Sequence, residues 1–455
     1  MPPRSVTADA ARVASVPAPG AGMPAWALTA AWTAIGLILW VMFPMTTTVL
    51  LPLCCIAPAA WHWAARGRVP HYPPSRMTAA FAAAGLYLLV NASWSLSLGS
   101  AVRAVAVVFV MIAALHVVLN TLPDLDDAPL RAMAAGALAG LMLAAGIICL
   151  EVFSDQSLRR FLMHLLPALQ PGGQHLAMEG GQLARLAAYL PNASVSVLAI
   201  MFWPAALIAS RLGLLRTHRS GALLAGAVVA ATIFASEHAT SQVAFVGAGA
   251  AFVLFRARPK LAAPLVIACW VAANLLVVPA ASVLYGAEAY RTAWLPHSAR
   301  HRIVIWGYTA EQIPKAPLLG AGIGTARALH DARAAEPSLA PGTSFHLSTS
   351  LHSHNAYLQV WYETGAAGAL LMLGLGLLIL RALLTFPADA RPYLMAAFVA
   401  CALGVASAYS IWAPWFMASL AMAAMFAALG AALPRRDPTR LLAGGEAERP
   451  TLRGM

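Results

Sequence analysis

Charged residues are scarce in this sequence. They make up 10% of the 455 residues, whereas a soluble domain carries about a quarter. Acidic residues are the rarer kind, since 17 Asp and Glu stand against 29 Lys and Arg and give a formal charge of +12. Hydrophobic residues make up 60%, and the mean hydropathy is +0.73. This composition excludes an ordinary soluble domain and predicts a polytopic membrane protein.

The sequence also lacks the marks of nucleic-acid binding and of a cysteine framework. No basic stripe is interleaved with aromatic residues and no zinc-ligand spacing occurs, so we expect no nucleic-acid partner. The cysteines lie inside apolar runs without CxxC spacing, and we interpret them as small buried hydrophobic residues. They are Cys54, Cys55, Cys149, Cys269 and Cys401. Residues 1–22 lack the apolar core of a signal peptide and are expected to form a flexible cytoplasmic tail.

Long apolar runs are what the sequence has in abundance. A membrane-spanning helix needs about 20 mostly apolar residues. Twelve runs meet this need, near residues 25–43, 46–65, 77–96, 103–122, 132–153, 193–211, 221–236, 241–255, 261–283, 365–384, 392–410 and 413–433. Only two connections between them are long, at 154–192 and 284–364. We therefore expect an all-α membrane protein of about twelve transmembrane helices with a large helical outer loop.

Basic residues indicate which side each connection faces. With both termini placed in the cytoplasm, the inner segments hold 19 of the 29 basic residues, and every short inner joint holds at least one arginine. The positive-inside rule then places both long connections on the outer side. The arginines that remain in these outer connections run against that rule, which indicates that something outside requires positive charge.

The first outer connection ends in the segment ARLAAYLPNASV, residues 184–195. Arg185 precedes Pro191 and Asn192, with which the next span is expected to begin. Two interpretations remain open for Arg185. It could lie at the membrane interface with its charge among lipid headgroups, or it could bind an anionic group at the outer surface. Pro191 and a capping Asn192 would fix the start of the following helix.

The second outer connection contains a segment with helical spacing, SARHRIVIWGYTAEQI at 298–313. Arg302 and Trp306 are four residues apart and therefore share one face of that helix. The glycine-rich segment APLLGAGIG at 316–324 follows. Its backbone N–H groups could face a phosphate, although the lysine of a nucleotide-binding loop is absent.

Histidines close the second outer connection, in the segment HSHNAYLQVWYETGAAG that begins at His352. A zinc pair, surface histidines and an acid–base group are the three alternatives. His354 precedes an expected helix whose first turn includes Asn355. The positive end of that helix would disfavour the imidazolium and keep His354 able to accept a proton. Glu363 could pair with an outer arginine or orient a histidine.

One further acidic pattern occurs on the opposite side of the expected membrane. Asp124 to Asp127 read DLDD, which contains an Asp-x-Asp pattern. It lies in a short cytoplasmic joint between two expected spans, so we interpret it as a solvated turn.

These features together resemble the O-antigen ligase and O-antigen polymerase superfamily. The resemblance is carried by RIVIW at 302–306, APLLGAGIG at 316–324, HSHNAYLQVWYETGAAG at 352–368 and ARLAAYLPNASV at 184–195. Ala316 departs from the commonest form of the family, which has a polar residue or histidine there. The resemblance is specific over about 180–205 and 295–370 and rests only on the helix layout elsewhere.

The resemblance implies a glycosyltransferase of GT-C-like fold in the bacterial inner membrane, with its active site on the periplasmic face. An O-antigen ligase transfers a polysaccharide from undecaprenyl pyrophosphate to a hydroxyl of lipid A–core. Its donor, its acceptor and membrane lipids are the implied partners, and no metal or other cofactor is implied. By this resemblance Arg185 and Arg302 would bind the donor pyrophosphate, and His354 would be the catalytic base. The other candidates, in supporting roles, are His352, Asn355, Glu363, Trp306 and Asn192.

Two other functions compete with the ligase. An O-antigen polymerase would use the same donor and extend a glycan instead. A lipid-linked glycan transporter would place ionisable residues at mid-membrane, whereas here the polar residues concentrate in the outer connections. The expected organisation is a cytoplasmic tail at 1–22, nine spans within 23–283, a periplasmic catalytic loop at 284–364, three spans within 365–433 and a second tail at 434–455.

Overall fold

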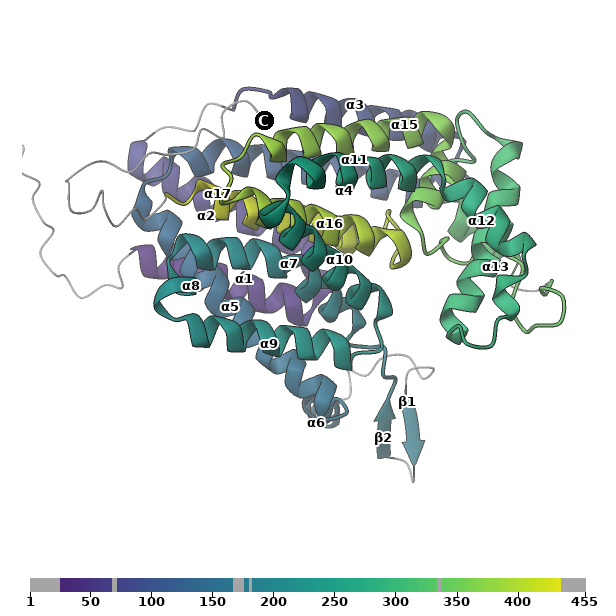
Figure 1. The fold of residues 1–455 in the computed structure, drawn as a ribbon, viewed down its shortest axis with the longest axis horizontal. Coiled ribbons are helices and arrows are strands. Elements are labelled where there is room, and N and C mark those ends of the chain that lie inside the picture. Colours follow the sequence, from purple (N-terminus) through teal and green to yellow (C-terminus); the bar gives the residue numbers. More distant parts are fainter. Residues whose placement is uncertain (1–24, 68–71, 167–175, 180–181, 334–337, 435–455) are drawn as a thin grey trace, which may run out of the picture.

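The computed structural model describes residues 25–67, 72–166, 176–179, 182–333 and 338–434. The expected tails at 1–22 and 434–455 lie outside these ranges, apart from Pro434, which is the final described residue. The described chain is a bundle of long helices, and Figure 1 shows them running side by side.

Eight helical segments in the described ranges are long and apolar enough to cross a membrane. They contain α2 (Thr47–Arg66), α3 (Arg76–Asn91), α4 (Leu98–Thr121), α5 (Asp127–Phe153), α7 (Asn192–Arg211), α10 (Ala239–Ala257), α15 (Ala356–Leu384) and α17 (Pro414–Ala432). A bent pair, α11 (Pro259–Leu275) and α12 (Val277–Gly286), would make a ninth span. Three shorter apolar helices are α1 (Ala25–Met42), α9 (Arg219–Ala235) and α16 (Arg391–Ser407). A helical segment thus lies at each of the twelve positions where a span was expected, and eight or nine of these segments have the length and hydropathy of a span. The structure confirms an all-α polytopic membrane protein.

The remaining elements lie in the connections. They are α6 (Ser157–Leu165), β1 (Leu176–Glu179), β2 (Gln182–Leu186), α8 (Leu214–Thr217), α13 (His297–Gln312) and α14 (Thr325–Arg333). The strands β1 and β2 pair antiparallel and project from the bundle as a small hairpin (Figure 1). The sequence analysis did not predict this hairpin. The helix predicted at 298–313 is α13, one residue out of step at each end.

One expected span is broken in the structure. The span predicted at 261–283 is two helices, α11 and α12, which meet at Leu276 with a bend of 62°. Pro279 lies in the first turn of α12, has no N–H to donate and would clash with the carbonyl of Leu275 in a continuous helix. Helix α12 therefore leads away from α11 toward α13 at the right-hand end of Figure 1.

The cysteine interpretation is wrong for Cys269. All five cysteines are free thiols, but Cys269 is exposed, and only Cys55 is buried. Leu261 and Leu265 of α11 are exposed on the same helical face as Cys269. This face of α11 is thus on the outside of the bundle, and an apolar run in the sequence does not distinguish such a face from one that packs in the core.

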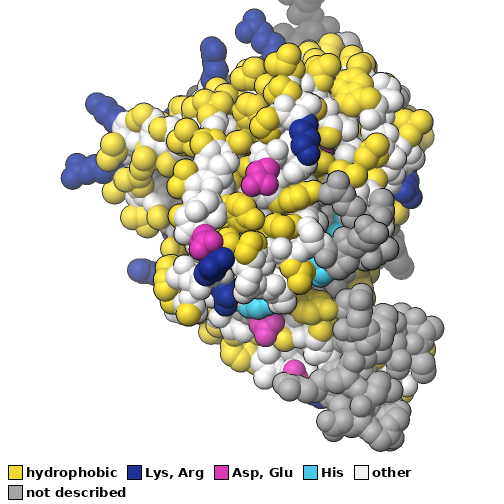
Figure 2. Space-filling model, turned by 90° about the vertical axis from the view of Figure 1, so that its right-hand side faces the viewer, with side chains coloured by type: hydrophobic (Ala, Val, Ile, Leu, Met, Phe, Trp, Pro, Cys, Tyr) yellow, Lys and Arg dark blue, Asp and Glu magenta, His cyan; other side chains and the backbone are white. Residues whose placement is uncertain are grey.

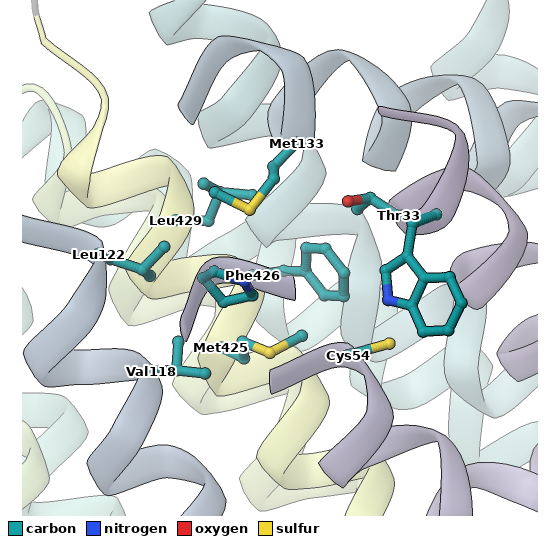
Figure 3. A pocket seen from close by; sticks show the side chains of 10 residues that line it. Thr33, Cys54, Val118, Leu122, Met133, Met425, Phe426 and Leu429 are labelled. Carbon is teal, nitrogen blue, oxygen red and sulfur yellow. The ribbon is translucent and has the colours of Figure 1, made fainter. Parts of the chain in front are cut away.

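The largest core cluster lies among α1, α2, α4, α5, α7, α16 and α17. The fully buried Trp40 of α1 stacks on Phe426 of α17 with 6.3 Å between ring centroids, and its indole N–H donates to Ser419 Oγ at 2.9 Å. A void of about 30 Å³ remains beside Phe426 (Figure 3), and its lining is apolar apart from Thr33 and Cys54. A void of this volume has room for about one water molecule and is too small for a substrate.

Two glycines allow α5 to pack closely on α1. A Cβ at Gly136 or Gly140 would overlap the backbone carbonyl of Ala30 or Ala34. These two glycines are four residues apart, which is the small-residue spacing that lets membrane helices approach closely.

Gly140→Leu is expected to separate α1 from α5 and to lower the free energy of unfolding by ~1–3 kcal/mol, the usual cost of overpacking. Thermal unfolding in detergent measures this as a lower Tm. Gly146→Leu is the matched control, because a Cβ at Gly146 of the same helix meets open space. Equal Tm values for the two variants would contradict the close α1–α5 contact.

Candidate functional site

The segment before α15 holds His354 in a constrained conformation. His354 has φ 51°, a left-handed value that non-glycine residues rarely adopt. Asn355 follows as the N-cap of α15, and its side chain accepts a hydrogen bond from Leu358 N at 3.1 Å. The cap therefore fixes the start of the helix immediately after His354.

His354 is held by a backbone carbonyl from a different part of the chain. Its Nδ1 lies 3.1 Å from the carbonyl oxygen of Ala408, in the turn between α16 and α17. A carbonyl can only accept, so Nδ1 carries the proton and Nε2 has a free lone pair. This tautomer is the one that can accept a proton at Nε2.

The environment keeps the His354 imidazole neutral. Burial lowers the pKa of His354 to about 4, the positive charge of Arg302 acts in the same direction, and the hydrogen bond to Ala408 opposes them. A neutral His354 was predicted from the sequence, with the amino terminus of the following helix as the expected cause. In the structure, burial is the largest cause.

Arg302 lies on α13, half-buried, and no ion pair or hydrogen bond of the described residues includes it. Burial lowers the pKa of its guanidinium, although an arginine stays charged in proteins. The groups that interact with Arg302 through their charges are His238, His301, His352, His354 and Tyr409. Arg302 thus places a desolvated positive charge close to His354, and no carboxylate in the described part of the chain neutralises it.

Trp306 fixes α13 against the segment of His354. Its indole N–H donates to the carbonyl oxygen of Ser353 at 2.9 Å. Trp306 is one helical turn after Arg302, so this bond also sets the position of Arg302 relative to His354. The shared face predicted for the two residues therefore joins the helix to the histidine segment.

His352 lies beside His354 with 4.1 Å between ring centroids. Both of its ring nitrogens are buried, and neither makes a hydrogen bond of good geometry with the described residues, although the carbonyl of Ala408 lies close enough to act on the pKa of His352. Burial lowers the pKa of His352 to about 3, and His354 adds to the shift. No group of three or more His, Cys, Asp or Glu suited to a metal ion occurs among the described residues.

Arg185 is located by the structure only through its backbone. It lies on β2, opposite Ala177 of β1, and its side chain is outside what the structure describes. The end of β2 is tied to α6, because Gln156 Nε2 donates to the carbonyl oxygen of Ala187 at 3.0 Å. The convergence of Arg185 with Arg302 and His354 therefore stays a prediction.

The capping role expected for Asn192 is wrong. Helix α7 begins at Asn192, Pro191 is its N-cap residue, and no side chain caps it. The Oδ1 atom of Asn192 is buried and has no partner among the described residues. Since Asn192 is already helical, its side chain is past the position from which an N-cap reaches the free N–H groups.

The glycine-rich segment packs against a break in α15. Gly320, Gly322 and Gly324 have positive φ, and Gly365 interrupts α15 with φ 62° and ψ −166°. A Cβ at Gly320 would overlap the backbone of Glu363. The two backbones therefore lie in direct contact, and the expected boundary between outer loop and span at 364/365 falls at this break.

The phosphate role considered for this glycine-rich segment does not fit its hydrogen bonds. Gly322 N donates to the carbonyl of Glu363 at 2.9 Å, and Ile323 N donates to Asn91 Oδ1 at 2.8 Å. Ala321 N donates to the carbonyl of Tyr362 at 3.0 Å. These N–H groups already have acceptors, so they are not available to an anion.

Glu363 is also used within the protein. It is fully buried, and its carboxylate accepts hydrogen bonds from Ala326 N at 2.9 Å, from Gln359 Nε2 at 3.2 Å and from Trp412 Nε1. Neither an arginine nor a histidine is among these donors in the described chain. Glu363 instead joins α14, α15 and the turn after α16, contrary to both roles considered for it.

Asn91 at the end of α3 holds the glycine-rich segment in place. This fully buried amide donates to the carbonyls of Leu319 at 2.8 Å and Glu363 at 3.3 Å, besides accepting from Ile323 N. Asn91 was not among the residues predicted from the sequence, because a lone Asn at the end of an apolar run carries no distinguishing pattern.

Asn91→Ala is expected to lower the free energy of unfolding by ~1–3 kcal/mol, since buried backbone groups lose their partners. Thermal unfolding of the purified protein measures the change. Ser93→Ala is the control, because its exposed hydroxyl bonds only to the carbonyl of Val90, at 2.8 Å, within the described chain. A Tm as high as that of Ser93→Ala would show that the amide does not hold the segment.

Polar residues from two short joints, also missed, complete this end of the bundle. His238 precedes α10, and its Nδ1 lies 2.6 Å from Ser241 Oγ and 3.1 Å from Ser196 Oγ of α7. Its ring stacks on Tyr409, in the turn after α16, with 5.8 Å between centroids. In the sequence, the concentration of polar residues in these short joints could have indicated that they belong to the site. Figure 2, which views the molecule from the right-hand side of Figure 1, shows histidine side chains near the middle of that face.

A large apolar cavity begins at the turn after α16, where Ile411 and Trp412 line it. Its volume is about 530 Å³, and it lies between α3, α4, α15, α16 and α17. Tyr87, Thr364 and Trp412 line it near the glycine-rich segment, and Thr78 and His116 line it elsewhere. The rest of the lining is nearly all apolar, as a site for a hydrocarbon chain requires.

The DLDD segment at 124–127, which contains the Asp-x-Asp pattern, lies apart from this site. Asp124 follows α4 and pairs with His62 at 4.0 Å, and Asp127 pairs with Arg131 one turn later. The first and the last aspartate of this segment thus have partners of their own, at the end of α4 and the start of α5.

Comparison with known proteins agrees with the geometry over one part of the chain. The family model described as O-antigen ligase matches residues 222–373, which are a third of the 455-residue sequence. The match includes Arg302, Trp306, the glycine-rich segment and His354, and it leaves out Arg185. No curated protein matches the chain. The match supports the O-antigen ligase and polymerase superfamily and a glycosyltransferase type of activity, and it does not separate ligase from polymerase.

Proposed function

We propose that this protein is an O-antigen ligase. In this reaction a polysaccharide moves from undecaprenyl pyrophosphate to a sugar hydroxyl of lipid A–core at the periplasmic face of the inner membrane. The observation that supports the proposal best is the pairing of His354, with its Nε2 lone pair free, and Arg302, a charge without an ion-pair partner among the described residues. A proton acceptor next to such a cation suits a hydroxyl that attacks while an anion leaves.

The proposed reaction is a single displacement. The acceptor oxygen forms a bond to the anomeric carbon, the bond from that carbon to the pyrophosphate oxygen breaks, and His354 Nε2 takes the acceptor proton. Attack opposite the leaving group inverts the anomeric configuration. The pyrophosphate gathers negative charge as it leaves, and Arg302 and Arg185 stabilise it, so the scheme requires no metal.

The apolar cavity gives the lipid part of the donor a place beside the reacting groups. Trp412 lines this cavity and lies three residues after Tyr409, in the same turn as Ala408. A prenyl chain in the cavity would confine its pyrophosphate to this end of the bundle, which lowers the entropy cost of bringing the reactants together.

Ala424→Trp is expected to fill part of the cavity and to raise the KM for the lipid-linked donor about tenfold, equal to ~1.4 kcal/mol of binding. Ala424 is an exposed side chain of α17 in the cavity lining. Initial rates at varied donor concentration measure the effect. Ala250→Trp is the control, since Ala250 is exposed on α10 and does not line the cavity. An unchanged KM for the donor would place the prenyl chain elsewhere.

Reconstitution tests the function itself. The purified protein, in vesicles with undecaprenyl-pyrophosphate-linked glycan and lipid A–core, is expected to form glycan-capped core without an ion gradient. Glycan extension on the carrier, with the core left uncapped, would identify a polymerase. Movement of the donor across the bilayer without any transfer would identify a transporter.

A further inference from the structure

The acceptor of the His354 hydrogen bond lies in an irregular turn. Helix α16 ends at Ser407, and Ala408 has φ −104° and ψ −99°, outside helical values. Its carbonyl therefore no longer points along the helix axis, and the carbonyl oxygen lies 3.1 Å from His354 Nδ1. Because no regular element sets this direction, the side chains that hold the turn must do so.

Tyr409 is the side chain that anchors the turn. Its ring contacts three other rings: His238 at 5.8 Å in a stacked arrangement, Trp415 at 4.6 Å edge-on and Phe416 at 5.3 Å edge-on, all between centroids. Aromatic contacts of this kind have preferred angles and distances. The ring of Tyr409 is thereby fixed, and so is the backbone of the adjacent Ala408.

His238 is itself held in place and stays neutral. It is 7% exposed, and its Nδ1 has the hydroxyls of Ser241 and Ser196 as partners. Burial lowers the pKa of His238 to about 4. Two residues later, Thr240 Oγ1 donates to the carbonyl of Ser407 at 3.1 Å. Helices α7 and α10 therefore form the rigid support on which the turn rests.

We propose that Tyr409, stacked on His238, is a positioning residue that holds the Ala408 carbonyl against His354 and thereby keeps the imidazole in the tautomer with a free Nε2. The proposal rests on the proposed role of His354 as the base. Without the ring, the turn can move, Nδ1 loses its acceptor, and water reaches the imidazole. The charged and titratable groups around the histidine pair would remain: Arg302 and His301 from α13, His352 from its own segment and Arg327 from α14.

The pH dependence of transfer distinguishes this role from a general loss of packing. In the wild-type protein His354 stays neutral above its lowered pKa of about 4, so the rate should be constant between pH 5 and pH 8. In Tyr409→Ala water reaches the imidazole and weakens the effect of burial, which is the largest cause, so the pKa of His354 should rise. The lost hydrogen bond and the charge of Arg302 act in the opposite direction, so the rise should be partial and the rate at pH 5 should be several-fold below that at pH 8. Tyr409→Phe keeps the ring and should keep the constant profile.

Control variants distinguish a specific role of Tyr409 from a general loss of packing and from an error in the role of His354. Tyr393→Ala removes a different tyrosine, a buried one on α16. Its ring packs on Phe252 at 4.9 Å and has no ring contact with the turn among the described residues, so its profile should parallel the wild type at any overall rate. Tyr409→Leu replaces Tyr409→Ala if the alanine variant does not fold. A profile of Tyr409→Ala, or of Tyr409→Leu in its place, that parallels the wild type would overturn the proposal. Full transfer by His354→Ala would overturn the role of His354 as the base instead.

Discussion

Replacing His354 by alanine is expected to reduce glycan transfer by at least ~10³-fold, within the range for removal of a general base. The acceptor hydroxyl would then have no group to take its proton. The His354 side chain makes one hydrogen bond in the described chain, to Ala408, and the cap of α15 is made by Asn355, so the variant should stay folded. It should also still bind the donor, because the pyrophosphate is assigned to the arginines.

Initial rates in reconstituted vesicles measure this effect, with donor binding followed separately. His164→Ala is the matched control, since His164 is exposed on α6 and takes no part in the proposed site. A normal rate for His354→Ala would remove it as the base. His352 would then be the next residue to replace, because its ring lies 4.1 Å from that of His354.

Removal of the Arg302 guanidinium should have the second-largest effect. Arg302→Ala is expected to lower kcat/KM for the donor by about 10²- to 10³-fold, the usual loss for one group that stabilises a developing anion. Arg302→Lys should recover only part of this, since lysine keeps the charge but not the two-pronged geometry. Arg185→Ala should act in the same direction if Arg185 shares the pyrophosphate.

Initial rates at varied donor concentration and at varied acceptor concentration distinguish a role of Arg302 in donor binding from a role in acceptor binding. Arg291→Ala serves as control, because Arg291 is a half-exposed arginine of the same connection that pairs with Glu288 at 3.1 Å. Its rates should match the wild type. If Arg302→Ala changes only the KM for the acceptor, then Arg302 does not bind the pyrophosphate.

The positions of the helices could be predicted from the sequence because hydrophobic length alone decides whether a segment can span a membrane. The bend at Leu276 could not, since a proline such as Pro279 is tolerated inside many membrane helices. The exposed face of α11 at Cys269 could not be predicted either, because side chains that face lipid and side chains that face the core are both apolar.

The site was predictable only where its residues lie close together in the sequence. Arg302 and Trp306 share a helical face, and His354 precedes a helix, so local spacing was enough to select them. The partner of His354 is 54 positions away, and Glu363 and the glycine-rich segment meet acceptors and donors from α3 and α14. Such contacts depend on how distant helices pack, which no periodicity in the sequence records.

The backbone contact between the glycine-rich segment and the break in α15 limits how related proteins can be recombined. A chimera that took only 316–324 from a homologue would insert new side chains against the chain at Gly365 and against Asn91. Successful grafts should instead carry three pieces at once: the end of α3, the glycine-rich segment and the first half of α15. Natural recombination between such genes should leave these three pieces with a shared ancestry.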